Sequence, residues 1–212
     1  TAASLVAIGH SALRKNTTGA NNTAVGVDSL ISNTTGADNV GIGASALDST
    51  TTGGENTAIG HQAGHNLTTG VNNTLLGHEA GTDAVANVVA SNGNIVIGNN
   101  YSASAKIKID WTVTSDLRDK TEIESVPHGL NFVNQITPIK YRFKTSREND
   151  TPNGVTRYGF KAQEILALEG ENPVLVDNGD TDNLKLTGAY LIPVLVNAIQ
   201  ELKAEIELLK NK

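Results

Sequence analysis

The chain has no cysteine in its 212 residues, which excludes a disulfide framework. No apolar run approaches the roughly 18 residues that a membrane-spanning helix needs, and no signal-peptide pattern opens the chain. A net charge of −6 argues against a surface that binds nucleic-acid phosphates. We therefore expect neither membrane insertion nor nucleic-acid binding. The chain begins at Thr1 rather than Met, which predicts a fragment of a longer protein.

The first half of the chain also lacks proline and is poor in basic and aromatic residues. Residues 1–110 contain four basic side chains and one aromatic, Tyr101, whereas residues 111–212 contain twelve basic side chains, the only tryptophan and all five prolines. A hundred residues of mostly Ala, Gly, Asn, Thr and Val offer little apolar area to offset the entropy of ordering. This half is therefore either disordered or dependent on identical chains for its core.

What the first half does contain is a repeat of 17 residues. The motif Asn-Thr-Ala-Val-Gly or a variant recurs between Asn22 and Gly77, and a fixed period predicts stacked supersecondary units. Each unit reads as a short strand ended by glycine and followed by a polar turn. The repeats run to about residue 87, and Asn94 restarts the motif four residues late, which predicts an insertion between Thr82 and Gly93. The glycine columns are Gly9, Gly26, Gly43, Gly60, Gly77 and Gly19, Gly36, Gly53, Gly70.

One apolar pair per strand predicts that a single chain cannot close its core, whereas three chains wound about one axis can. We thus expect residues 1–114 to form a homotrimeric β-repeat fibre of the β-helix or β-roll type. The repeats are similar to the heads of trimeric surface adhesins and to phage fibre tips. Chains with equal repeats can misalign by a whole repeat, so we expect an element that fixes their register.

Three histidines directly follow a column glycine: His10, His61 and His78. In a trimer each would form a ring of three imidazoles, a weak candidate for an anion or metal site. Val27 and Ala44 occupy the same position in other repeats, so exposed loop residues are the favoured interpretation. We predict no metal and no cofactor.

Residues 105–114 alternate between apolar and polar side chains, which predicts a half-buried strand that leads to Ser115. Residues 115–188 have the mixed pattern of an α+β domain. We expect a turn or brief helix at 119–127, a helix at 130–136, a strand at 139–144, a polar hairpin tip at 144–155, a strand at 158–160, a helix at 162–168 and a second hairpin at 174–186.

The last segment, 189–212, has a heptad pattern that predicts a coiled-coil helix. Isoleucine at a with leucine at d favours two strands under the packing rule, whereas the fibre favours three, which we adopt. Pro193 suits the first turn, and Glu201 and Lys203 are among the outer residues. The seam consists of Ile192, Leu195, Ile199, Leu202, Ile206 and Leu209.

The join between the halves carries the pattern Ser115-Asp-Leu-Arg-Asp-Lys120. A serine hydroxyl becomes a nucleophile when a base takes its proton, and a lysine is that base where burial or a neighbouring cation favours its neutral form. Arg118 is the neighbouring cation. The plain alternative is a polar turn between two domains.

This hexapeptide, followed by 136–143 and 158–164, resembles the C-terminal intramolecular chaperone and self-cleaving domain of phage tail spikes and fibres, the endosialidase type. The resemblance implies a domain that templates trimer folding and then releases itself as a single-turnover serine endopeptidase. It makes Ser115 the nucleophile and Lys120 the base. It also implies protrusions that hold unfolded fibre chains, for which the two hairpins are candidates. The supporting residues are Arg118, Asp119, Gln163 and Glu164.

The scissile bond stays open at this stage. The family cuts after the serine, at Ser115–Asp116, whereas the commoner route of attack on the preceding carbonyl cuts Thr114–Ser115. The attacking hydroxyl belongs either to the same residue or to a neighbouring chain. The resemblance further implies that residues 1–115 stay in the virion as a tail fibre that binds a bacterial surface receptor. The chaperone domain is then released in the host cytoplasm during assembly.

Two other functions compete with this hypothesis. A trimeric adhesin stalk with a C-terminal trimerisation domain needs no chemistry, and its chain would stay intact after expression. A glycosidase in the repeat half is disfavoured, because paired acids are missing there: Asp28, Asp38, Asp48 and Glu55 lie at scattered registers.

Overall fold

The computed structural model describes residues 4–82, 86–99, 101–102, 108, 115–144 and 147–211. The chain divides into two compact units, Thr1–Ala105 and Lys106–Lys212. The strand predicted at 105–114 lies outside the described residues except for Lys108. Within the described part of the chain, no helix is long and apolar enough to cross a membrane.

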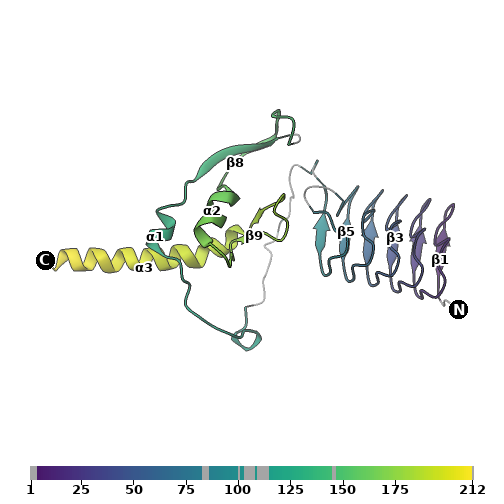
Figure 1. Cartoon of the computed structure of the whole chain (residues 1–212), viewed down its shortest axis with the longest axis horizontal. Helices are drawn as coiled ribbons and strands as arrows, with labels where there is room; N and C mark the ends of the chain where they lie inside the picture. Colours follow the sequence, from purple (N-terminus) through teal and green to yellow (C-terminus); the bar gives the residue numbers. More distant parts are fainter. Residues whose placement is uncertain are drawn as a thin grey trace. The chain divides into compact units, whose positions relative to one another are not determined.

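The first unit is a β-solenoid, in which each turn contributes one short strand to a parallel sheet (Figure 1). Neighbouring strands pair 17 residues apart, and the last pair joins Thr74 to Ile95. The predicted insertion is thereby confirmed, because the final step of the ladder spans 21 residues. The strands are β1 (Val6–Ile8), β2 (Thr23–Val25), β3 (Val40–Ile42), β4 (Thr57–Ile59), β5 (Thr74–Leu76) and β6 (Ile95–Ile97).

The solenoid closes its core within one chain, so the expectation that this half needs identical chains for its core is wrong. Leu30, Leu47 and Leu75 are fully buried, and Ala24 and Ala58 lie between them. Ala58, for example, is the register partner of Leu75 on the next strand, and both belong to this cluster. Stacking therefore supplies the apolar contact that a single repeat lacks.

A ladder of buried asparagines runs through the same core. The side-chain oxygen of Asn39 accepts hydrogen bonds from both the backbone nitrogen and Nδ2 of Asn56, at 3.1 and 3.0 Å. Asn56 Nδ2 also donates to the Gly70 carbonyl at 2.9 Å. The same bonds recur from turn to turn, so these polar groups are satisfied without water. The ladder residues are Asn22, Asn39, Asn56, Asn73 and Asn94.

The column glycines allow the turns to stack closely. Gly43 has φ +133°, and a Cβ there would lie 2.4 Å from the Gly60 carbonyl oxygen of the next turn. A side chain at this position would push adjacent turns apart. The glycine column predicted from the period is thus explained by close backbone approach.

The outer face of the solenoid sheet carries a column of apolar side chains. Ile42 pairs in register with Ile59, and their exposed fractions are 38% and 39%. Each turn adds one such residue to the column, directly beside the last. We call this the outer column: Ile8, Val25, Ile42, Ile59, Leu76 and Ile97.

The second unit is a small α+β arrangement that ends in a long helix. Two antiparallel hairpins, β7–β8 and β9–β10, flank α2 in the chain. The elements are η1 (Leu117–Asp119), α1 (Leu130–Val133), β7 (Ile139–Lys144), β8 (Pro152–Gly159), α2 (Ala162–Glu169), β9 (Val176–Asp177), β10 (Lys185–Leu186), η2 (Gly188–Tyr190) and α3 (Leu191–Lys210).

The strands and helices predicted from residue 130 onward are confirmed in order, with one correction at the first hairpin. The turn or brief helix expected at 119–127 lies earlier, as η1 at Leu117–Asp119, and residues 120–127 form neither helix nor turn. Asn153 and Gly154 were expected at its tip but lie within β8, where Asn153 pairs with Phe143. Gly154 has φ +71°, and the register shifts between Tyr141 and Phe143. The Asn-Gly pair therefore lies beside an irregularity in the ladder instead of making the turn.

Helix α3 has two apolar faces. One face packs Leu191, Val194 and Ala198 inward, and the first two belong to a core with Phe132 of α1 and Ile165 of α2. The other face is the predicted heptad seam, whose residues are all exposed in this chain, from 42% at Ile206 to 68% at Leu209. The seam has no cover within the described part of the chain.

Candidate functional site

The candidate site is the loop Ser115–Lys120, which is built around the single turn η1. Asp116 caps this turn, because its Oδ1 accepts a hydrogen bond from the Arg118 backbone nitrogen at 2.9 Å. The Arg118 guanidinium binds the same carboxylate through Nε to Oδ1 at 3.0 Å and Nη2 to Oδ2 at 2.6 Å. This bidentate pairing fixes the fold of the loop.

The loop brings the predicted nucleophile and base together. Lys120 Nζ donates to Ser115 Oγ at 2.8 Å. The turn between them places the two side chains on the same side, five residues apart in sequence. Proton transfer between a hydroxyl and an amine requires this kind of contact, so the geometry permits general-base activation of Ser115.

Ion pairing changes the acid–base behaviour of two loop residues. The side-chain hydrogen bonds from Arg118 hold the pKa of the Asp116 carboxyl below its ordinary value, and Asp116 in turn raises the pKa of Arg118. Both groups therefore stay charged and paired over the neutral range. Arg118 was expected to act as a neighbouring cation for Lys120. Its guanidinium is paired with the Asp116 carboxylate, and its effect on Lys120 remains a prediction.

The other predicted supporting residues lie on two different elements. Asp119 ends η1, whereas Gln163 and Glu164 lie in α2. Glu164 Oε1 accepts from Thr137 Oγ1 at 3.1 Å, which ties α2 to the residues before β7. In the described ranges no hydrogen bond or ion pair joins Gln163 or Glu164 to Ser115–Lys120, and their predicted support of the site remains a prediction.

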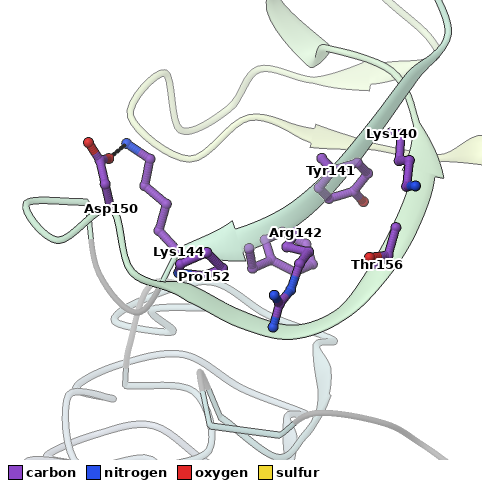
Figure 2. A pocket seen from close by; sticks show the side chains of 8 residues that line it. Lys140, Tyr141, Arg142, Lys144, Asp150, Pro152 and Thr156 are labelled. Carbon is purple, nitrogen blue, oxygen red and sulfur yellow. Dashed lines mark ion pairs between the residues drawn. The ribbon is translucent and has the colours of Figure 1, made fainter.

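The β7–β8 hairpin has an open hollow lined by basic and aromatic side chains (Figure 2). The Arg157 guanidinium lies 5.3 Å from the Phe143 ring centre, and Tyr141 meets that ring edge-on at 5.4 Å. Lys144 forms an ion pair with Asp150 across the hollow. The hairpin thus combines positive charge with apolar surface. The lining residues are Lys140, Tyr141, Arg142, Phe143, Lys144, Asp150, Pro152 and Thr156.

The histidines of the repeat are arranged along the solenoid axis. His61 and His78 lie on consecutive turns with stacked rings 5.2 Å apart, whereas His10 lies three repeats before His61. Among the described residues no group of three or more His, Cys, Asp or Glu side chains is arranged to hold a metal ion. A ring formed by three chains stays a prediction.

Comparison with known proteins adds one finding. A peptidase family model described as the chaperone of endosialidase matches residues 115–175. The match begins at the candidate nucleophile and supports an intramolecular chaperone domain here and, in general terms, self-cleaving peptidase activity. No curated protein and no solved structure matches the chain.

Proposed function

We propose that this chain is the C-terminal part of a phage tail fibre or tail spike. Residues 115–212 act as an intramolecular chaperone that aligns three fibre chains and then releases itself by Ser-Lys autoproteolysis. The observation that carries the proposal is the 2.8 Å contact between Lys120 Nζ and Ser115 Oγ at the start of the family match. The fibre remains in the virion to bind a bacterial surface receptor, and the released domain stays in the host cytoplasm.

The chemistry follows from this contact. Acting as the base, Lys120 Nζ takes the hydroxyl proton while Ser115 Oγ forms a bond to a peptide carbonyl carbon. The amide C–N bond then breaks, and the proton passes from Nζ to the departing nitrogen. The remaining ester to Oγ is hydrolysed by water, which yields a carboxylate and restores the hydroxyl.

The two possible bonds give different fragments. Attack on the preceding carbonyl breaks Thr114–Ser115, and the released domain then begins with Ser115. Attack by the hydroxyl of a neighbouring chain on the Ser115 carbonyl breaks Ser115–Asp116, and the domain begins with Asp116. The exact mass of the released domain distinguishes the routes, since they differ by one serine.

The outer column supports association of identical chains. Successive side chains of the outer column are separated by the strand spacing of about 4.8 Å. A surface that packs against the column must therefore repeat at the same interval. A second copy in parallel register meets this condition at every turn. The column therefore favours a fibre in which solenoids pack side by side, each with its own core.

The exposed seam of α3 supports association at the other end of the chain. Ile199 and Leu202 are 65% and 44% exposed in one chain, although burial of such a side chain stabilises by about 1.5–3 kcal/mol. A short coiled coil of three helices covers them. Because the seam occurs once in each chain, its packing aligns the three chains in a single register. It thereby sets the register that the equal repeats leave open.

The chaperone role follows from tethering. While residues 115–212 remain attached, they hold three fibre chains at high effective concentration. The basic and aromatic hollow of the β7–β8 hairpin is the candidate surface for holding the unfolded repeats, because the described solenoid carries more acidic than basic residues.

The test compares the full chain with three single variants. Ser115→Ala and Lys120→Ala should each remove cutting while the trimer forms, whereas Ser125→Ala, a nearby exposed serine, should be cut like the wild type. A denaturing gel gives the fragments, and light scattering gives the assembly. Two fragments of the original sizes from either dyad variant would contradict the Ser-Lys assignment, and a wild type that stays intact would favour the stalk.

A further inference from the structure

Helix α3 is joined to the chain that follows the candidate site by a polar grip. Asn197 Nδ2 donates to the carbonyl oxygen of His128 at 2.9 Å and to that of Val126 at 3.5 Å. Glu201 Oε2 accepts from the Leu130 backbone nitrogen at 2.6 Å, which caps the start of α1. We call these contacts the α3 grip.

The local sequence fits this grip closely. A Cβ on Gly129 would lie 2.2 Å from Glu201 Oε1, so only glycine lets the carboxylate approach the backbone here. The His128 ring stacks on Phe132 at 4.2 Å, and Phe132 is buried in the core of the unit. The gripped segment is therefore held by packing as well as by hydrogen bonds.

The chain between the site and the grip is short. Lys120 and Val126 are separated by five residues, which span at most about 20 Å when extended. All five are exposed, and Glu122 among them has the left-handed φ of +51°. Such a conformation in a non-glycine residue persists where both flanking segments are fixed. The segment runs from the Asp116–Arg118 turn, which is held by its own hydrogen bonds, to the α3 grip.

We propose that Asn197 and Glu201 are positioning residues that make the cleavage site depend on helix α3. This inference rests on the proposed self-cleavage. One face of α3 forms the seam between chains, and the opposite side holds the segment that follows Lys120. The grip forms in the single chain, whose seam is exposed, so the site depends on α3 being folded against the segment that follows Lys120. Loss of the grip therefore slows cutting, because a misplacement of about 1 Å slows a positioned reaction about a hundredfold.

The experiment uses the full chain with Asn197→Ala, Glu201→Ala and Glu201→Gln. Glu205→Ala is the matched control, since Glu205 lies one turn further along α3 and is exposed. Light scattering first establishes that each variant is assembled. We expect the two alanine variants to cut roughly ten- to a hundredfold more slowly. Glu201→Gln keeps an acceptor oxygen and should recover most of the rate.

A second readout does not depend on cutting. In a Ser115→Ala background, hydrogen exchange at the Leu130 amide should rise with Glu201→Ala and remain unchanged with Glu205→Ala. If Glu201→Ala raises hydrogen exchange at the Leu130 amide but is cut at the wild-type rate, this inference is wrong. The Ser115–Lys120 assignment is unaffected by that result. Equal loss of rate in Glu201→Gln and Glu201→Ala also overturns the inference, because the hydrogen bond is then not what matters. A wild type that is never cut overturns the proposed function and this inference together.

Discussion

At the scale of single residues, the asparagine ladder explains how a half-chain so poor in large apolar residues folds. Asn22, Asn39 and Asn56 have no exposed surface, yet each side-chain oxygen and amide is satisfied by the adjacent turns. Buried polar groups stabilise a fold only when all are paired. The uninterrupted repeat supplies that pairing at every level.

Replacing Asn56 with alanine should destabilise the solenoid by about 3 kcal/mol. The change removes the acceptor of the Asn73 backbone N–H and the donor to the Gly70 carbonyl oxygen, and each group left without a partner costs about 1–3 kcal/mol. The Asn39 oxygen keeps its bond from the backbone nitrogen of residue 56, and Asn73 Nδ2 keeps its bonds to Val71 and Ser91. Asn66→Ala is the control, because Asn66 is half-buried and outside the ladder. Urea unfolding followed by circular dichroism measures the difference, and equal midpoints for the two variants would contradict the role of the ladder.

The solenoid also contains a half-buried acid, Asp48, whose ionisation affects stability. Burial raises the pKa of the Asp48 carboxyl, and His65, at 2.7 Å, offsets only part of that rise. The folded chain therefore binds this proton more readily than the unfolded chain. Its contribution to stability is complete below the ordinary pKa of 3.8 and is lost as pH rises through the raised value.

Asp48→Asn should consequently unfold at a higher temperature than wild type at pH 7, because the buried charge is gone while an acceptor for His65 remains. The gain should shrink as the pH approaches 3, where wild-type Asp48 is also neutral. Thermal unfolding at several pH values provides the measurement. A variant that is less stable than wild type at pH 7 would show that the ion pair outweighs burial.

At the scale of elements, the seam of α3 is the clearest target. Ile199→Asp with Leu202→Asp should abolish the proposed trimer, because two apolar residues per chain would be replaced by charged ones in the seam. Gln200→Asp is the control, because it adds a negative charge on α3 outside the seam. Light scattering reports the assembly. If the double seam variant still forms a soluble folded trimer, the seam of α3 is not required for assembly.

Sequence periodicity predicted the elements well because each has a local signal. The 17-residue period, the late restart at Asn94 and the helix at the C-terminus follow from spacing alone. The single-chain core was missed because its partners are one turn away: Leu75 fills space that Gly64 and Gly81 leave open. The Ser115–Lys120 contact is local and was expected, whereas the Glu201 contact spans 71 residues and Glu201 reads in sequence as an ordinary outer charge.

At the scale of the whole molecule, the proposed release makes fibre formation a one-way process. Before cutting, tethering lowers the entropic cost of bringing three chains together. After cutting, that help is gone, and the fibre persists because unfolding is slow. The lifetime of the finished fibre is then set by the rate at which it unfolds.

The refolding of cut and uncut protein should therefore differ. Uncut Ser115→Ala, denatured and returned to buffer, should recover its trimer, whereas the isolated fibre fragment should recover little and aggregate. Size-exclusion chromatography with light scattering measures the recovered fraction. Full recovery of the isolated fragment would show that the C-terminal unit is dispensable for assembly.

The 17-residue step has a consequence for length. Each repeat adds one strand and therefore about 4.8 Å of rise, while the glycine column, the ladder and the outer column continue unchanged. Duplication or loss of one repeat in the gene lengthens or shortens the shaft by a fixed increment. The 21-residue step before β6 gives the complementary rule, since its additional residues leave the strand spacing intact. The length of the solenoid is thus encoded as a count of repeats, independently of the residues that the loops display.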